Sequence, residues 1–108
     1  MNFQEYQELS ARTANDHDYK LANYGLGIAG EAGEVADLIK KAIFHGHSIK
    51  TAEVKKELGD VLWYLSQIAS TAGLSLEEIA ITNIEKLKKR FPNGFSVEDS
   101  IKRVDANE

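Results

Sequence analysis

The chain has 108 residues, a formal net charge of −4 at pH 7 and no cysteine. Its 43% hydrophobic and 28% charged residues are ordinary for a folded protein, and its length predicts one domain over residues 1–108. The lack of cysteine excludes disulfides and thiolate zinc sites, and the acidic balance argues against a nucleic-acid partner. We expect a cytoplasmic protein without a membrane partner, because the start lacks a signal-peptide pattern and no apolar run approaches the ~20 residues that span a membrane.

The spacing of apolar residues predicts helices joined by short turns, with almost no strand-type alternation. The first expected helix covers 2–14, with Phe3, Tyr6, Leu9 and Thr13 toward the core, and the polar stretch 15–18 is expected to be a loop. The later expected helices cover 20–44, 51–72 and 76–91, and the glycines and caps that bound them are Gly46, Thr51, Gly73 and the capping box Ser75–Glu78. The turn Pro92-Asn93-Gly94 follows, and the tail has room for a short helix from Val97. The predicted fold class is therefore all-α, with four main helices.

Two acidic pairs with the same local pattern dominate the middle of the chain. Glu31-Ala-Gly-Glu34-Val and Glu57-Leu-Gly-Asp60-Val each place two acids three residues apart, on one face of a helix. The stretch between the pairs is long enough for the rest of one helix, a turn and the start of the next. On two antiparallel helices, the pairs would bring four carboxylates together.

The position of these acids on their helices is unusual for surface charges. At about 100° per residue, the first acid of each pair lies about 40° from the centre of the apolar stripe, and the second about 100° from it. Charged residues normally occupy the opposite face, and an acid at a core position must be paired, protonated or bound to a metal. Oxygen ligands suit Mg²⁺, which also keeps waters that a phosphate can displace. The motifs therefore predict metal-assisted phosphate chemistry.

The fourth expected helix carries polar side chains along one edge of its apolar stripe, namely Asn83, Lys86 and Arg90. Lysine and arginine suit phosphate oxygens, which favours a polyphosphate ligand. The alternative is that these cations only balance the dipole at the C-terminal end of a helix. Gly33, Gly59 and Trp63 point away from the apolar stripes, which predicts a second buried surface and a homo-oligomer.

The acid motifs resemble the signature of the MazG-like all-α nucleoside triphosphate pyrophosphohydrolases. The matching segments are Gly30-Glu31-Ala-Gly-Glu34-Val-Ala-Asp37, Lys56-Glu57-Leu-Gly-Asp60-Val-Leu, Asn83-x-x-Lys86 and the ending Lys89-Arg90-Phe91-Pro92-x-Gly94-Phe95. The resemblance covers about residues 2–95, which leaves 96–108 as a C-terminal tail. It implies a four-helix bundle-like core that oligomerises through helix packing into a homodimer or homotetramer.

The resemblance also implies an activity and a set of site residues. The activity is Mg²⁺-dependent hydrolysis of a nucleoside triphosphate, either a dNTP or a non-canonical NTP, to the monophosphate and pyrophosphate, with Mn²⁺ as a possible substitute. The metal ligands would be Glu31, Glu34, Glu57 and Asp60, with Asn83, Lys86 and Arg90 on the substrate. Glu34 and Glu57 are the predicted catalytic residues, and Glu34 has the more open position for a general base.

Two alternatives remain open from the sequence. The first is a phosphoribosyl-ATP pyrophosphohydrolase of histidine biosynthesis, which resembles this family in fold and acid motif. The second is a non-catalytic helical module for metal binding or dimerisation, which would bind a metal without turning over any triphosphate.

Overall fold

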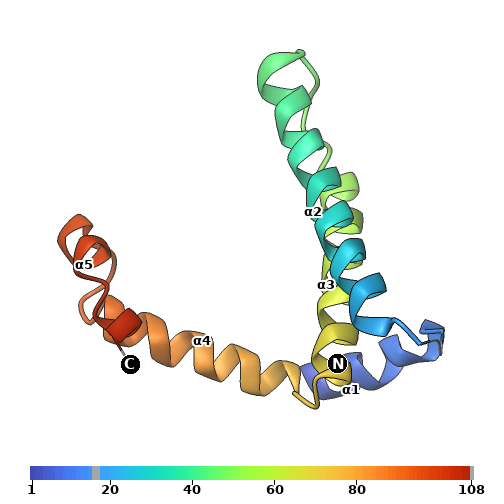
Figure 1. The fold of residues 1–108 in the computed structure, drawn as a ribbon. Coiled ribbons are helices and arrows are strands. Elements are labelled where there is room, and N and C mark those ends of the chain that lie inside the picture. The colour runs from blue at the N-terminus through green and yellow to red at the C-terminus, as the bar shows by residue number, and fades with distance from the viewer. Residues whose placement is uncertain (16–17, 108) are drawn as a thin grey trace. The chain divides into compact units, whose positions relative to one another are not determined.

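The computed structural model describes residues 1–15 and 18–107, and within these ranges it contains helices and no named strand (Figure 1). The all-α class predicted from the sequence is therefore confirmed. No helix in the described ranges is long and apolar enough to cross a membrane. In chain order the elements are α1 (Phe3–Ser10), the 3₁₀ helix η1 (Ala11–Thr13), α2 (Lys20–Phe44), α3 (Thr51–Thr71), α4 (Leu76–Arg90), α5 (Val97–Lys102) and the 3₁₀ helix η2 (Val104–Asn107).

The helix boundaries follow the turn signals in the sequence closely. Gly46 and Gly73 have φ values of 74° and 75°, the left-handed conformation that glycine adopts readily past the end of a helix. One expected cap is displaced, because Thr51 is the first residue of α3 and Lys50 occupies the N-cap position without a side-chain hydrogen bond. Two residues of the expected loop 15–18, Asp16 and His17, lie outside the described residues.

The chain divides into two compact units, Met1–Ser75 and Leu76–Glu108. The first contains α1, η1, α2 and α3, and the second contains α4, α5 and η2. The single domain over 1–108 and the four-helix core both stay predictions.

In the first unit, α2 and α3 pack side by side as an antiparallel hairpin, and α1 packs on α3 (Figure 1). An aromatic cluster joins these helices near the end of α1. The ring of Tyr24, which is buried, meets Trp63 edge-on at a centroid distance of 5.9 Å, and Trp63 meets Tyr64 edge-on at 5.0 Å. Edge-to-face packing of this kind is favourable beyond the area that it buries, so the cluster fixes the relative position of α2 and α3.

The contact between α1 and α3 is polar, which the sequence did not suggest. Ser10, Ser66 and Gln67 are buried, and the Ser10 hydroxyl lies 2.9 Å from the Ser66 hydroxyl and 3.0 Å from Nε2 of Gln67, which donates to it. The expected core residues Phe3 and Leu9 are instead 49% and 52% exposed. A fully satisfied buried polar network specifies one packing arrangement, so these hydrogen bonds set where α1 sits on α3.

The second unit folds its tail back on the C-terminal end of α4. Gly94 (φ 87°) turns the chain, the Ser96 hydroxyl caps α5, and the Phe91 and Phe95 rings pack with centroids 5.4 Å apart. The short helix expected from Val97 is present as α5.

Candidate metal centre

Three of the four predicted metal ligands come together on the α2–α3 hairpin. Glu31 lies on α2, and Glu57 and Asp60 lie one turn apart on α3. One carboxylate oxygen from each of the three lies within 4.8 Å of the others. Oxygen donors at this spacing from two helices suit a hard divalent cation such as Mg²⁺ or Mn²⁺.

The raised pKa of Glu31 reflects both burial and the crowding of negative charge. Burial raises the pKa of Glu31 above its usual value, and a hydrogen bond to Glu57 and the charges of Asp60, Glu57 and Glu34 raise it further. Neighbouring carboxylates disfavour each other's ionised form, and a bound cation would remove that cost. The donor set therefore fits a divalent metal ion.

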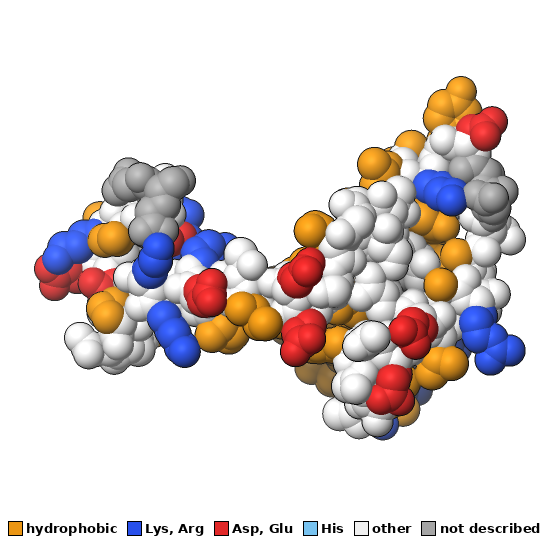
Figure 2. All heavy atoms as spheres, turned by 90° about the horizontal axis from the view of Figure 1, so that it is seen from below, with side chains coloured by type: hydrophobic (Ala, Val, Ile, Leu, Met, Phe, Trp, Pro, Cys, Tyr) orange, Lys and Arg blue, Asp and Glu red, His pale blue; other side chains and the backbone are white. Residues whose placement is uncertain are grey.

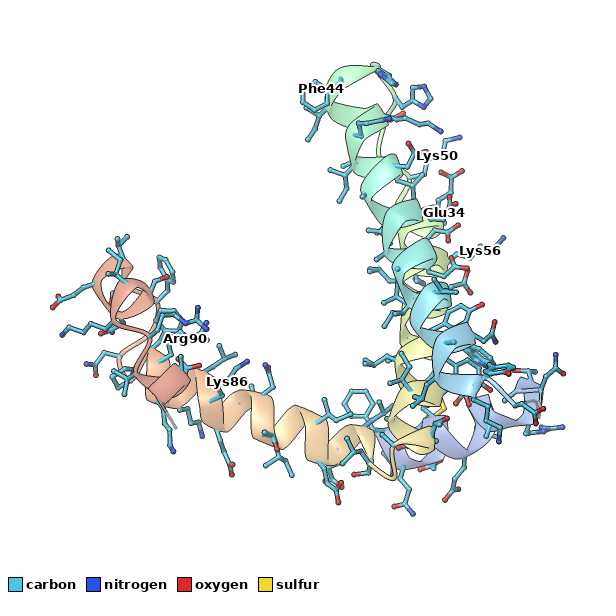
Figure 3. The ribbon with its side chains drawn as sticks, in the orientation of Figure 1. Glu34, Phe44, Lys50, Lys56, Lys86 and Arg90 are labelled. Atoms are coloured by element: carbon cyan, nitrogen blue, oxygen red, sulfur yellow. The ribbon has the colours of Figure 1, made fainter. Side chains whose placement is uncertain are left out.

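Glu34 lies one turn beyond Glu31 on α2 and is exposed. Its carboxylate is not among the three clustered ones, although its charge acts on both Glu31 and Lys41. Figure 3 shows Glu34 extending from the same side of the hairpin as Lys50 and Lys56. Its roles as fourth ligand and general base stay predictions.

A pocket of about 350 Å³ opens beside the acidic cluster and is lined by Thr13, Glu31, Asp60, Trp63 and Tyr64. The Trp63 ring in its wall is held by hydrogen bonds to two residues. The Trp63 indole N–H lies 3.0 Å from the Ser10 carbonyl oxygen and 2.9 Å from the Thr13 hydroxyl, both of which accept from it. Trp63 is therefore used inside the first unit, which corrects its reading as part of a second buried surface.

Gly27 on α2 is a site residue that the sequence reasoning missed. An added Cβ at this position would lie 2.1 Å from the Tyr64 ring, so only glycine lets the ring approach the helix backbone this closely. A mid-helix glycine one turn before an acidic motif was the available signal. By contrast, no described atom lies within 4 Å of a Cβ added at Gly33 or Gly59.

Tyr6 of α1 borders the cluster on the Asp60 side. Burial raises the pKa of the Tyr6 phenol, and the negative charge of Asp60 raises it further. Tyr6 also lines a largely apolar pocket of about 420 Å³ together with Met1, Asn2, Phe3 and Leu62. The N-terminal helix thus adds a neutral phenol and an apolar surface next to the carboxylates.

The predicted substrate residues Asn83, Lys86 and Arg90 all lie on α4, in the second unit (Figure 3). Asn83 and Lys86 are exposed. Their contact with substrate stays a prediction.

The Arg90 guanidinium is already engaged inside the second unit. Its Nε and a terminal nitrogen donate to the two carboxylate oxygens of Asp105 at 2.6 and 2.7 Å, and the Asp105 side chain is only 4% exposed. The hydrogen bond from Arg90 lowers the pKa of the Asp105 carboxyl. This bidentate pair pins η2 to α4, so a phosphate would have to displace Asp105 in order to bind Arg90.

Comparisons with known proteins agree with the geometry. The family model described as the MazG nucleotide pyrophosphohydrolase domain matches residues 20–95, which contain all four acids and the three α4 residues. The "Gene 37 protein" of Mycobacterium phage L5 is 36% identical over 73 residues, which cover 64% of this chain and 64% of that protein. The chain thus spans just under two thirds of the length of this relative. No solved structure matches the chain significantly.

Proposed function

Because the chain belongs to the MazG nucleotide pyrophosphohydrolase family, we propose that it hydrolyses a nucleoside triphosphate to the monophosphate and pyrophosphate with Mg²⁺. A dNTP or a non-canonical NTP is the proposed substrate, and Mn²⁺ is the proposed substitute ion. The convergence of three carboxylates within 4.8 Å on two packed helices supports this proposal most directly. Glu31, Glu57 and Asp60 would hold the ion, and Glu34 would complete the set.

The ion, when bound, would neutralise phosphate oxygens and lower the pKa of a water molecule. The protein's own groups then have distinct tasks. Glu34, which is exposed beside the cluster, would accept the proton of the attacking water as a general base in addition to its role as a ligand. The water oxygen forms the new bond to phosphorus, the bond to the bridging oxygen breaks, and pyrophosphate leaves with that oxygen.

Negative charge on the leaving pyrophosphate requires cations. We assign this role to Lys86, with Asn83 donating a hydrogen bond to a phosphate oxygen. Arg90 is the second candidate, but its guanidinium must first leave Asp105. We therefore expect Lys86 to contribute more than Arg90.

A homo-oligomer, dimeric or tetrameric, is part of the same proposal. Along α2, apolar or small residues recur at three- and four-residue steps from Leu21 through Ile28, Val35 and Ile39 to Ile43. Leu21, Ile39 and Ile43 are 55%, 45% and 66% exposed, and Figure 2 shows hydrophobic side chains at the surface. An apolar seam of this spacing on a long helix is the pattern that packs against another helix. A second copy of the chain is the proposed partner.

The test is pyrophosphate release from a panel of NTPs, dNTPs, modified dNTPs and phosphoribosyl-ATP, with Mg²⁺ and with EDTA. We expect Glu57→Gln to reduce Mg²⁺-dependent release by about a hundredfold or more, because it removes a ligand charge from the reacting centre. Glu77→Gln, an exposed acid in the first turn of α4, is the matched control and should retain full activity.

Each outcome of this panel has one meaning. Full activity of the Glu57→Gln variant contradicts the metal assignment. Turnover of phosphoribosyl-ATP alone points to the histidine-pathway enzyme. Metal binding by calorimetry without turnover of any substrate points to a non-catalytic helical module.

A further inference from the structure

The turn between α2 and α3 encloses a second polar pocket, separate from the one beside Asp60. Its volume is about 410 Å³, and it lies against the last turns of α2 and the first turn of α3. Its lining consists of Leu38, Lys41, Gly46, His47, Ser48, Ile49, Lys50 and Glu53. The left-handed Gly46 reverses the chain here, and the amide of His47 donates to the Lys41 carbonyl oxygen at 3.1 Å. The pocket is therefore shaped by a hydrogen-bonded turn.

Two lysines from different elements contribute cations to this pocket. The ammonium of Lys41, on α2, lies 2.9 Å from the Asp37 carboxylate, which neutralises much of its charge. Lys50 immediately precedes α3, and within residues 1–15 and 18–107 its ammonium makes no ion pair. The positive charge of Lys50 is thus available to a ligand in the pocket. The positive charge of Lys41 is already largely neutralised by Asp37.

The pocket continues the face that carries the acidic cluster. Glu34, Lys50 and Lys56 extend from one side of the hairpin, while Phe44 extends from the other (Figure 3). The charge of Glu34 acts on Glu31 at the cluster and on Lys41 at the pocket. Lys50 precedes Glu57 by two helical turns, which separates the two backbone positions by roughly 10 Å. The long lysine side chain can bring its ammonium closer to Glu57 than this. One extended polyanion can therefore contact both places.

We propose that this pocket binds the two terminal phosphates of the triphosphate, and hence the pyrophosphate product. Lys50 is the principal contact that the first unit supplies, in addition to the cation Lys86 proposed above. The inference rests on the proposed function. Three ionised carboxylates would carry more negative charge than the +2 of the ion that they would hold, so the outer phosphates need cations on the same face. Glu53 also lines the pocket, so together with Lys41 and Lys50 it leaves a net charge of about +1, which has the sign that attracts a phosphate pair.

The test compares Lys50→Gln with Lys55→Gln in the full chain. Lys55 is an exposed lysine on α3 outside the pocket lining, so both variants lose the same charge. The measurements are KM for a turned-over dNTP, inhibition by Mg-pyrophosphate and by the nucleoside monophosphate, and calorimetric binding of Mg-pyrophosphate. We expect Lys50→Gln to weaken triphosphate and pyrophosphate binding about tenfold, the effect of one charge-assisted hydrogen bond. Inhibition by the monophosphate, which lacks the terminal phosphates, should stay unchanged, and Lys55→Gln should match the wild type.

The proposal is overturned if Lys50→Gln binds pyrophosphate as tightly as the wild type does, or if Lys55→Gln weakens binding equally. An equal loss of monophosphate inhibition also contradicts it, because the effect would then not be confined to the terminal phosphates. Circular dichroism checks that Lys50→Gln keeps its helices. A wild-type chain that hydrolyses no triphosphate overturns the proposed function instead, and calorimetry with Mg-pyrophosphate still decides the role of Lys50.

Discussion

The carboxyl of Glu31 shows most clearly that the acidic cluster opposes folding when no cation is present. Burial, the hydrogen bond to Glu57 and three neighbouring acids all raise its pKa, so its ionised form is disfavoured in the folded chain. Residues that serve chemistry are often retained against stability in this way. The cluster should therefore leave a measurable signature in the stability of the protein, independent of any activity.

Glu31→Gln should raise the melting temperature in EDTA by a few degrees, because it removes one of several repelling charges. Added Mg²⁺ should stabilise the wild type by mass action and have little effect on the variant. Differential scanning calorimetry at pH 7, with and without Mg²⁺, measures both. A variant that melts below the wild type in EDTA would show that Glu31 acts as a structural residue.

Gly27→Ala tests the close approach of α2 to Tyr64. Its Cβ would lie 2.1 Å from a ring already held by Trp63 and Tyr24. Overpacking of this kind costs about 1–3 kcal/mol, which outweighs a gain in helix propensity of up to about 1 kcal/mol. Urea denaturation should show a net loss of stability, together with reduced activity because Tyr64 lines the pocket beside Asp60.

Gly30→Ala is the matched control for Gly27→Ala. It lies on the same helix, and no described atom lies within 4 Å of the added Cβ. It should raise stability by about 0.5–1 kcal/mol, since alanine is the better helix former. Equal effects of the two substitutions would contradict the predicted clash with Tyr64.

At the scale of single elements, the sequence predicted helices best where local rules act alone. The bounds of α2 match the expected 20–44, because a long apolar period and a left-handed glycine at position 46 are both local signals. The acid pairs could be predicted for the same reason, since their angle around the helix follows from their spacing. The convergence of Glu31 with Glu57 and Asp60 could be predicted as soon as the two helices were expected to pack as an antiparallel hairpin.

Contacts between distant segments were beyond such rules. Ser10 and Ser66 are 56 residues apart, and nothing in either neighbourhood predicts that they share a buried hydrogen bond. The helical angle predicts that Trp63 lies away from the apolar stripe of its helix, and this is correct. Its hydrogen-bond partner, however, lies in η1 of the same unit. Asp105 lies in a tail without a strong pattern, so its capture of Arg90 could not be predicted.

The pairing of α4 with η2 through Arg90 and Asp105 predicts a specific dependence of stability on pH. The pKa of Asp105 is lower in the folded chain than in the unfolded chain, where it is about 3.9. The pair therefore stabilises the fold above pH 4, and the contribution disappears as the pH falls through the lower folded value. Asp105→Asn should lower the urea midpoint at pH 7, and the deficit should shrink at pH 2–3.

The control for Asp105→Asn is Glu98→Gln, which breaks the exposed ion pair of α5 with Lys102, whose side chains are 77% and 57% exposed. Exposed pairs contribute little, so its midpoint should match the wild type at both pH values. A deficit of Asp105→Asn that is the same at pH 7 and at pH 2–3 would show that shape, and not charge, makes this contact stabilising.

For the molecule as a whole, one chain leaves much apolar surface without a partner. In the described ranges the hydrophobic residues that are buried are Tyr24, Ala69 and Leu76, while long side chains such as Ile43 remain largely exposed. A chain of this length usually buries about 65% of its unfolded surface, and large exposed apolar patches mark interaction sites. The seam on α2 is the most regular of these surfaces. A substitution in this seam should therefore disrupt oligomerisation more than a substitution elsewhere.

Ile39→Arg should convert the oligomer to a monomer, because it places a charge at the centre of the apolar seam, where burial would cost several kcal/mol. Light scattering after size exclusion should give a mass at least twice that of one chain for the wild type and a single-chain mass for the variant. Leu26→Arg is the control, since Leu26 is also exposed on α2 but lies roughly 140° around the helix from Ile39. A monomeric wild type, or dissociation by Leu26→Arg alone, would remove the α2 seam as the interface. Because Glu31 lies on the same helix, a monomeric Ile39→Arg chain that still binds Mg²⁺ would further show that the metal centre is complete within one hairpin.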